Sequence, residues 1–425
     1  VAGAAVLALA LSALAAAPAS AGPTAAPYVV VLEPGVDVAG ATSVLEGRLG
    51  FRATFRYRNA LAGFAARLTW TQRSALEADP LVDYVAADRT FTASGTATML
   101  PGETLPAGVR RIGAATPATV HQAANGAVAV LDTGVDLVNA DLDVAGGRNC
   151  ISTTASASDD NGHGTNVAGI IAARNNGARV VGVAPGTRIY SVKVLNSKKS
   201  GTLSQILCGI DWVTANAAAL GIKVANMSIA GSGANDNNCG YTNNDPYHRA
   251  ICRSVVAGVS YVASAGNSKA AFAKTVPAAY PEVLTVTAMN DSNGLAGGGG
   301  AWRTCSSGEK DDHHATYSNY AVSSADQAHT VAAPGTCVQS SARGGGLSVY
   351  TGTSQAAPHV AGAVALCLGN GGAAGPCAGL SPSGVIAKLR SDAAAAATSA
   401  NGFHGDPLRP VSGKHFGHLV AAAGY

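Results

Sequence analysis

Charged and aromatic side chains are scarce in this sequence of 425 residues. Asp, Glu, Lys and Arg together make up 12% and Phe, Trp and Tyr 5%, whereas 47% of the residues are hydrophobic. Such an apolar composition excludes a disordered chain and predicts a globular protein with room for two or three domains. The net charge of +3 is too small to favour nucleic acid or an anionic membrane as a partner.

Long apolar segments are also absent after the first residues. Residues 1–21 are rich in Ala and Leu and end in Ala19-Ser20-Ala21, whose small side chains suit a signal peptidase. We therefore expect a signal peptide cleaved after Ala21, shortened at its start because an initiator Met and a basic n-region are missing. The alternative is a membrane anchor, for which the apolar run is short. The prediction is a secreted protein with no membrane association after cleavage.

No C-x-x-C pair occurs among the eight cysteines, which argues against a zinc site. In an exported chain, eight cysteines can form four disulfides, with 105 possible pairings. We favour pairs that are close in the sequence, namely Cys239–Cys252 and Cys367–Cys377 and then Cys305–Cys337.

The first part of the chain predicts a small α+β domain. We expect strands at 28–32, 53–57, 62–68 and 82–86, and helices at 41–49 and from a Thr71 cap through residue 78. The order βαββαβ is the ferredoxin-like arrangement. Residues 88–108 are rich in Thr, Gly, Ser and Pro and are predicted to be a linker.

The pattern after this linker predicts an α/β fold. Apolar runs alternate with helical stretches, and we find no internal repeat. The alternation is typical of a mostly parallel sheet with helices on both faces. The predicted strands are 127–131, 189–195, 224–229, 261–264 and 283–288, and the predicted helices are 163–173, 203–220 and 246–258.

Ser354 is the first candidate for chemistry. It follows a glycine turn and opens a helix of small residues, in which Pro358 is tolerated because it lies near the first turn. The free N–H groups and the dipole of a helix N-terminus favour an oxyanion there. The alternative is an ordinary serine that caps a buried helix.

Two further residues complete a possible proton relay. Asp132 directly follows a predicted strand, and His163 lies between two glycines where a helix begins. A lone histidine could be structural, and Asp132-Thr133-Gly134 also occurs in aspartic proteases. Aspartic chemistry needs a second such carboxylate, however, and the sequence contains no second Asp-Thr/Ser-Gly. Together the three residues offer a nucleophile, a base and an orienting group.

Residues 130–136, 161–165 and 352–359 resemble the three signature blocks of the subtilisin family of serine proteases, in that family's order Asp…His…Ser. An α/β-hydrolase esterase is excluded because the order differs and Ala356 replaces the second glycine of its G-x-S-x-G turn. The resemblance implies a secreted endopeptidase that forms an acyl-enzyme, with Ser354 as nucleophile, His163 as general base and acid, and Asp132 orienting His163. The alternative is a non-catalytic, subtilisin-like binding protein.

The resemblance extends to the substrate site. Residues 264–267 resemble the family's oxyanion block, so Asn267 is expected to donate its side-chain N–H to the oxyanion. Residues 228–231 resemble the strand that pairs with an extended peptide. Ala230 stands where the family usually has glycine, Asn166 replaces a usual histidine and Gln355 a usual methionine. The implied substrate-binding residues are Ser228, Ile229, Ala230, Ala265, Gly266 and Gly201.

The same resemblance implies a zymogen, because residues 28–88 are similar to the family's propeptide inhibitor domain. We expect a signal peptide at 1–21, a propeptide at 22–95 and a peptidase domain at 96–425, with self-cleavage between about Asp88 and Gly108. The implied partners are extended polypeptide substrates and the chain's own propeptide. We expect a monomer that binds no nucleic acid.

A structural calcium ion is also implied, although no organic cofactor is. Asp141 follows Asp132 by nine positions, as the family's calcium carboxylate does. Arg174 and Arg179 add positive charge that opposes tight binding, and the alternative is a helix end that turns without an ion. The implied ligands are the side chains of Asp141 and Asn176 and the carbonyls of Arg174, Ala178 and Val180.

Overall fold

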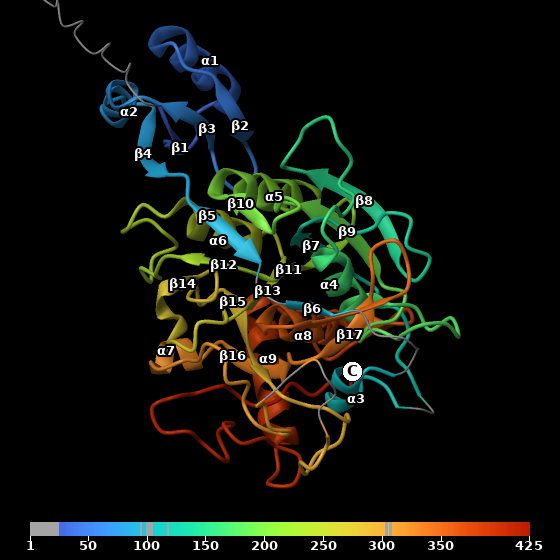
Figure 1. The fold of residues 1–425 in the computed structure, drawn as a ribbon. Coiled ribbons are helices and arrows are strands. Elements are labelled where there is room, and N and C mark those ends of the chain that lie inside the picture. The colour runs from blue at the N-terminus through green and yellow to red at the C-terminus, as the bar shows by residue number, and fades with distance from the viewer. Residues whose placement is uncertain (1–24, 94–95, 99–104, 117–118, 302–304, 306–307) are drawn as a thin grey trace, which may run out of the picture.

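The computed structural model describes residues 25–93, 96–98, 105–116, 119–301, 305 and 308–425. The expected signal peptide at 1–21 lies outside these residues. The chain forms a small N-terminal unit that sits on a larger body (Figure 1). Within the described residues, every helix is too short or too polar to cross a bilayer.

The N-terminal unit has the predicted βαββαβ order. Its four-stranded sheet has the strand order β2-β3-β1-β4, and the helices lie between the strands in sequence. The second helix starts two residues earlier than predicted, because Thr69 and not Thr71 forms the cap, in a reciprocal capping box with Gln72. The elements are β1 (Ala26–Leu32), α1 (Val38–Leu49), β2 (Ala53–Tyr57), β3 (Gly63–Leu68), α2 (Trp70–Glu77) and β4 (Val82–Ala87).

The predicted linker at 88–108 contains regular elements that were not predicted. It contains β5 (Thr90–Ala93) and β6 (Thr96–Thr98), and α3 (Ala107–Arg111) begins at its end. The partners of both strands lie more than 100 residues away, so local composition carried no signal for them. Strand β5 lies between β10 (Ser200–Thr202) and β12 (Ile229–Ser232), and β6 pairs with β18 (Leu347–Thr351).

The larger body is built on a seven-stranded sheet, which confirms the predicted α/β fold. Its order is β16-β15-β13-β11-β7-β9-β8, and all of its ladders are parallel. The predicted strand 224–229 is divided, because β11 ends at Met227 and β12 starts at Ile229. The strands are β7 (Ala127–Asp132), β8 (Asp143–Asn149), β9 (Arg188–Lys193), β11 (Ile222–Met227), β13 (Ser260–Ser264), β15 (Val283–Met289) and β16 (Thr330–Pro334).

Helices cover both faces of this sheet and bury two separate cores. On one face, Val167, Val360 and Leu389 pack from α4, α8 and α9, and on the other Ile210 and Ile251 pack from α5 and α6. The N-terminal unit extends the second core, because its Tyr57, Leu61 and Tyr84 belong to the same cluster. The helices are α4 (His163–Ala172), α5 (Leu203–Asn216), α6 (Pro246–Val256), α7 (Ser324–Gln327), α8 (Thr353–Leu368) and α9 (Pro382–Ala396).

Smaller elements close the body around this framework. They are the 3-10 helix η1 (Phe272–Lys274), β14 (Thr275–Val276), β17 (Val338–Ser341), β19 (Gly369–Asn370) and β20 (Ala373–Ala374).

All eight cysteines form disulfides. The three favoured pairs, Cys239–Cys252, Cys305–Cys337 and Cys367–Cys377, are confirmed. The remaining pair, Cys150–Cys208, connects the end of β8 to α5. These bonds are typical of proteins that fold in an oxidising compartment.

Candidate active site

Asp132 and His163 meet at the carboxyl end of β7, an interior strand of the seven-stranded sheet. Strand β7 ends at Asp132 and α4 begins at His163. The His163 Nδ1 and Asp132 Oδ1 atoms are 2.8 Å apart, and both side chains are completely buried. Oδ1 also accepts the backbone N–H of Thr133 at 2.6 Å. This end of the strands is where open α/β sheets place their binding sites.

The loop before His163 is held by Asp159. One carboxylate oxygen accepts the backbone N–H groups of Asn161 and Gly162, both at 2.9 Å, and the other accepts the N–H and hydroxyl of Thr165. The Thr133 hydroxyl also donates to Asp159. Asp159 was not among the predicted site residues, although Asp-x-Asn-Gly is a turn pattern that could have identified it.

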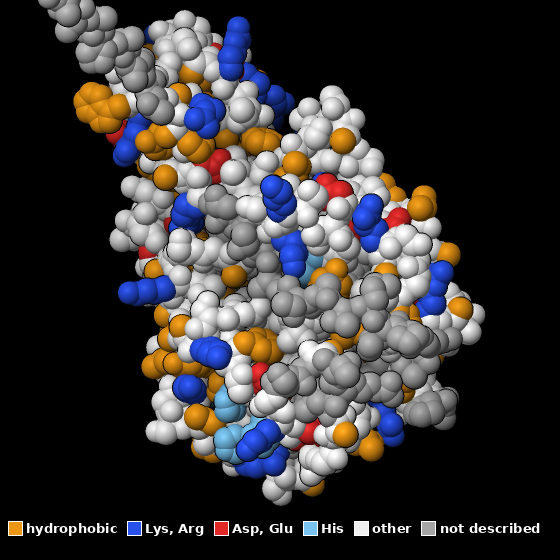
Figure 2. Space-filling view, viewed as in Figure 1, with side chains coloured by type: hydrophobic (Ala, Val, Ile, Leu, Met, Phe, Trp, Pro, Cys, Tyr) orange, Lys and Arg blue, Asp and Glu red, His pale blue; other side chains and the backbone are white. Residues whose placement is uncertain are grey.

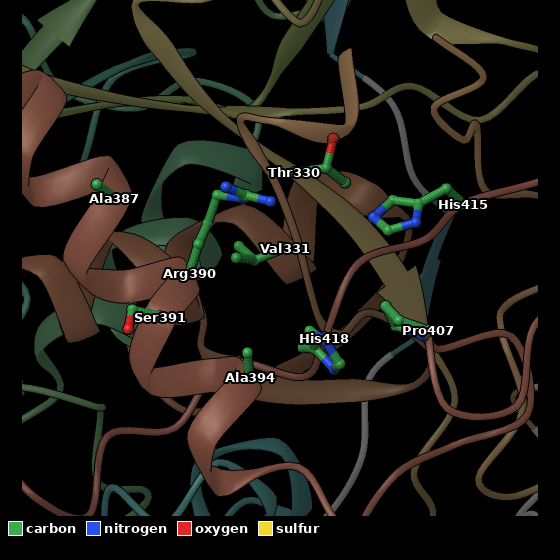
Figure 3. A pocket seen from close by; sticks show the side chains of 9 residues that line it. All are labelled: Thr330, Val331, Ala387, Arg390, Ser391, Ala394, Pro407, His415 and His418. Atoms are coloured by element: carbon green, nitrogen blue, oxygen red, sulfur yellow. The ribbon is translucent and has the colours of Figure 1, made fainter. Parts of the chain in front are cut away.

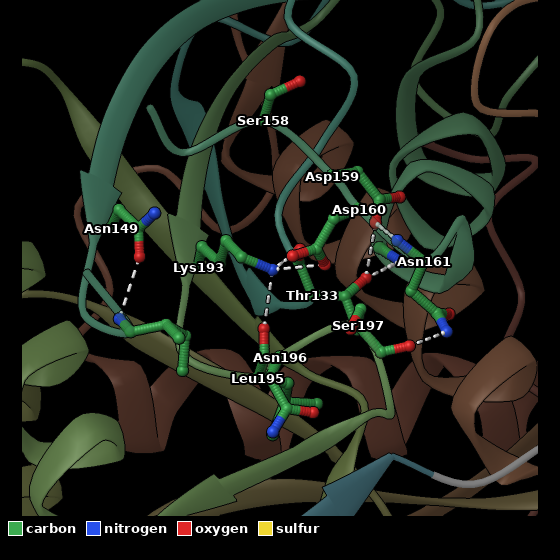
Figure 4. Close-up of polar contacts among 12 residues, drawn as sticks. Thr133, Asn149, Ser158, Asp159, Asp160, Asn161, Lys193, Leu195, Asn196 and Ser197 are labelled. Carbon is green, nitrogen blue, oxygen red and sulfur yellow. Dashed lines mark hydrogen bonds and ion pairs between the residues drawn. The ribbon is translucent and has the colours of Figure 1, made fainter. Parts of the chain in front are cut away.

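Lys193 is a second residue that the sequence analysis missed. Figure 4 shows its ammonium group at the centre of three contacts, with the Thr133 carbonyl at 2.6 Å, the Leu195 carbonyl at 2.8 Å and the Asp160 carboxylate at 2.6 Å. The side chain is only 4% exposed. A buried ammonium with three acceptors fixes the backbone just after Asp132. A lysine inside an apolar strand gave no local sign of this role.

Ser354 is the second residue of α8. Its hydroxyl donates to the Ser228 carbonyl at 3.1 Å, and the Ser228 hydroxyl donates to the Ser354 carbonyl at 2.7 Å. The neighbouring Gln355 amide donates to the Asn166 side chain at 3.4 Å. Because Asn166 is in the first turn of α4 and Gln355 in the first turn of α8, this contact brings the helix starts of His163 and Ser354 together.

Asn267 is oriented toward the start of the same helix. Its Oδ1 accepts the backbone N–H of Thr353 at 2.9 Å and the Thr353 hydroxyl at 2.8 Å. The carbonyl end is therefore occupied, and the NH₂ end is the one able to donate elsewhere. Gly266 has a φ of +100°, and a Cβ there would lie 2.5 Å from the Asn319 amide nitrogen, which donates to Ala265. Glycine is therefore required before Asn267.

The predicted substrate segments flank a strand of the chain itself. Strand β5 is antiparallel to both β10 and β12. The register pairs Gly201 with Phe91, Ala230 with Thr92 and Ile229 with Ala93. The structure thus places three of the predicted substrate-binding residues beside one extended segment from the predicted propeptide.

Two carboxylates connect α5 to the N-terminal unit. Asp211 Oδ1 accepts the backbone N–H groups of Arg58, Asn59 and Ala60 at 3.2, 2.8 and 3.0 Å. Asp88 accepts the Ser204 N–H at 2.6 Å and also the Ser204 hydroxyl. Burial raises the pKa of the Asp88 carboxyl above its ordinary value.

The predicted calcium ligands Asp141 and Asn176 are also neighbours. The Asn176 amide donates to Asp141 Oδ1 at 3.1 Å, and the carboxylate is completely buried. Asn176 Oδ1 accepts the Ala178 N–H at 3.0 Å. The Arg174 guanidinium lies 3.6 Å from the Asp143 carboxylate, which offsets part of its positive charge.

A second group of metal-ligand residue types lies elsewhere, comprising Cys239, His248, Cys252 and Glu282. Both of its sulfurs are joined in a disulfide, so they offer no thiolate to a metal.

Comparison with known proteins points in one direction. The model of the subtilase family matches residues 124–401. Subtilisin E of Bacillus subtilis (strain 168) is 35% identical over 321 residues, which cover 74% of this chain and 71% of that protein. Subtilisin of Bacillus pumilus is 36% identical over 273 residues, which cover 63% of this chain and 85% of that protein.

A solved structure shows the same likeness. The crystal structure of a cold adapted subtilisin-like serine proteinase aligns with a TM-score of 0.52 and 27% sequence identity. The alignment covers 75% of this chain and 99% of that one.

Proposed function

Since this chain belongs to the subtilase family and is a serine-type endopeptidase, we propose that Asp132, His163 and Ser354 perform its catalysis. The Ser354 hydroxyl attacks the peptide carbonyl and forms an acyl-enzyme, which water then hydrolyses. His163 takes the Ser354 proton and delivers it to the leaving amine. Asp132 accepts the Nδ1–H of His163 and so keeps Nε2 available as the base. The buried 2.8 Å contact between Asp132 and His163 carries this proposal.

The oxyanion of the tetrahedral intermediate would be bound by two N–H groups. These are the Asn267 side-chain amide and the Ser354 backbone N–H at the start of α8. The support is the orientation of Asn267, whose Oδ1 is held by Thr353 while its NH₂ end can donate. Donors fixed before the reaction stabilise the developing charge without reorganisation.

Extended polypeptides are the substrate class that fits the two flanking strands. A peptide placed as β5 is placed would form antiparallel ladders with β10 on one side and β12 on the other. Ser228, Ile229, Ala230, Ala265, Gly266 and Gly201 would contact it.

The N-terminal unit would act as an intramolecular inhibitor. We infer a secreted zymogen with a signal peptide at 1–21, a propeptide at 22–95 and a peptidase domain at 96–425. The unit packs on α5 and α6, and β5 follows it and lies between β10 and β12, the strands proposed to bind substrate (Figure 1). A strand in that position excludes any other peptide.

A structural calcium ion would be held by Asp141 and Asn176, with the carbonyls of Arg174, Ala178 and Val180. The support is the buried Asp141 carboxylate, a donor type that calcium prefers, with the Asn176 side chain in contact with it. The ion would stabilise the loop after α4 and would take no part in the reaction.

Replacement of Ser354 tests the proposed function. We expect Ser354→Ala to abolish peptidase activity and labelling by a fluorophosphonate, and to leave the precursor uncleaved. Ser383→Ala, at an exposed serine of α9, is the matched control and should process normally. Cleavage of purified Ser354→Ala precursor without another protease would contradict self-processing. Absence of labelling in the unmodified protein would favour the non-catalytic binding protein.

A further inference from the structure

A cavity of about 340 Å³ lies between α9, the start of β16 and the C-terminal segment (Figure 3). It shares no lining residue with the proposed catalytic site. Its polar lining consists of Arg390 and Ser391 from α9, Thr330 from β16, and His415 and His418 from the C-terminal segment.

The cavity is lined by groups that carry or acquire positive charge, and its lining contains no carboxylate. Residues 387, 390, 391 and 394 follow helical spacing and so share one face of α9. Two of them are alanines, which leave space beside Arg390. The one acidic residue of α9, Asp392, is engaged elsewhere by Lys388 at 2.6 Å and by the Tyr425 hydroxyl at 3.0 Å.

Two nitrogens at the cavity are buried and have no hydrogen-bond partner among the described residues. They are Nε of Arg390 and Nδ1 of His418. Within the described part of the chain, Arg390 also forms no ion pair. Buried polar groups of native proteins are usually paired, so these two require an explanation.

The positively charged forms of Arg390, His415 and His418 repel one another at the cavity. Burial lowers the pKa of Arg390. Burial is the main cause that lowers the pKa values of His415 and His418, and the Arg390 charge lowers both further. On His418 the Asp406 carboxylate opposes burial and raises the pKa, with an effect larger than that of Arg390. Asp406 lies to one side, where it accepts the backbone N–H groups of Phe403, Leu408 and Arg409. An anion in the cavity would relieve this repulsion.

We propose that this cavity binds a small oxyanion of the phosphate or sulfate class. The Arg390 guanidinium would donate to two anion oxygens, His418 and His415 would donate from their rings, and the Ser391 hydroxyl would complete the shell. The cavity is larger than a bare phosphate, so it also admits a phosphoryl group on a small organic molecule.

Binding would connect parts of the chain that are distant in sequence. Arg390 belongs to α9, whereas the histidines belong to the final segment, whose His418 carbonyl accepts the Ala332 N–H of β16 at 2.8 Å. An anion held by both would fix α9 to the edge of the central sheet. Histidine side chains also gather with Lys and Arg at the lower end of the face in Figure 2.

The binding should depend on pH. Each histidine carries its proton only below its pKa, which is lowered here from the ordinary value of 6.5. An anion favours the protonated rings, so its affinity rises as the pH falls through this range.

The test is a calorimetric titration of the full chain with inorganic phosphate at about pH 5.5 and about pH 8, at equal ionic strength set with chloride. We expect one saturable site that binds phosphate more tightly at the lower pH. Added phosphate should also raise the thermal midpoint of the protein. Arg390→Gln should weaken binding about tenfold or more, since it removes a charged donor. His418→Gln should reduce the pH dependence. Arg253→Gln, at an exposed arginine of α6, is the control and should bind like the unmodified chain.

Thermal midpoints without phosphate establish that each variant folds, and Arg390→Lys, which keeps the charge, replaces Arg390→Gln if that variant does not fold. A second titration uses phenyl phosphate. The tighter binder of inorganic phosphate and phenyl phosphate shows whether the cavity prefers the free ion or a phosphoryl group on an organic molecule. Absence of a saturable site at tens of millimolar phosphate would overturn the proposal, and so would unchanged binding by Arg390→Gln and His418→Gln together. Because Ser354 plays no part in this binding, neither result depends on the proposed peptidase mechanism.

Discussion

The contact between Asp211 and the N-terminal unit allows a sharp test of inhibition by the propeptide. Asp211 is on α5, in the body, and one of its oxygens accepts three successive backbone N–H groups of the loop between β2 and β3. Asp211→Ala would remove all three acceptor contacts without changing a proposed catalytic residue. We expect weaker inhibition of the processed enzyme by the N-terminal unit and unchanged kcat of the enzyme alone.

The size of the effect follows from the number of contacts. A hydrogen bond to a charged group contributes about 1.5–3 kcal/mol, and a neutral one about 0.5–1.5 kcal/mol. The three N–H groups share one partly exposed oxygen, so we take about 1 kcal/mol for each and about 3 kcal/mol in total. Since about 1.4 kcal/mol is a factor of ten, the inhibition constant should rise about 100-fold.

The assay is inhibition of the processed enzyme by a separately produced segment 22–95, with a chromogenic peptide as substrate. Asp211→Asn keeps one acceptor oxygen and should give an intermediate inhibition constant. Asp143→Ala changes an aspartate on β8 of the enzyme body and is the matched control. The segment 22–95 should inhibit this variant enzyme as strongly as the unmodified one. A change of less than about threefold for Asp211→Ala would refute the reasoning, because it would mean that these contacts contribute less than about 0.7 kcal/mol.

Three further predictions concern the oxyanion donor, a buried carboxyl and calcium. Asn267→Ala should lower kcat about 10²–10³-fold with little change in KM, the established cost in the relative subtilisin, and steady-state kinetics that show no loss would exclude Asn267 as a donor. Asp291 lies just after β15 and is buried 2.8 Å from the Arg111 guanidinium. Burial raises the pKa of Asp291 to about 7 against the opposing effect of Arg111, so its stabilising contribution is present below its unfolded pKa of about 4 and is lost as the pH rises through about 7. Asp291→Asn should therefore reduce the change of the thermal midpoint with pH across this window. A pH dependence equal to that of the unmodified protein would reject the raised pKa. Millimolar calcium should raise the thermal midpoint relative to excess chelator, and Asp141→Ala should remove the difference; equal midpoints for the unmodified protein would dispose of the calcium site.

Much of the body could be predicted because its central strands are buried on both faces. Strands β7, β13 and β15 are mostly apolar and fully buried, and each lies within a residue or so of its predicted bounds. The edge strands β8 and β16 were missed for different reasons. Strand β8 includes Asp143, two glycines and Arg148, and its exposed edge position requires no apolar run. Strand β16 is only five residues long, and its alanines and proline carry little strand signal.

Some residues of the candidate site could be predicted from their sequence neighbours, and others depend on contacts with distant parts of the chain. Asp132, His163 and Ser354 are in short motifs that could be identified from their own neighbours. Lys193 could not, because its importance lies in contacts with the Thr133 and Leu195 carbonyls and the Asp160 carboxylate that only the folded chain brings together. Asp159 is intermediate, since its turn contacts to Asn161 and Gly162 are local whereas its contact with Thr133 is not.

The proposed role of the N-terminal unit as inhibitor makes the position of β5 decisive for how the chain would compete with its substrates. A strand tethered beside its own groove has an effective concentration of the order of millimolar, whatever the concentration of the protein. A free peptide can therefore compete only if its concentration exceeds this effective concentration, or after β5 has been cleaved and has dissociated. The concentration of the released segment depends on the total protein concentration. A dilute solution of the protein would therefore activate more fully than a concentrated one, in which released segments rebind to other molecules. A cut strand that is then digested cannot rebind, so the first active molecules would accelerate the activation of the rest.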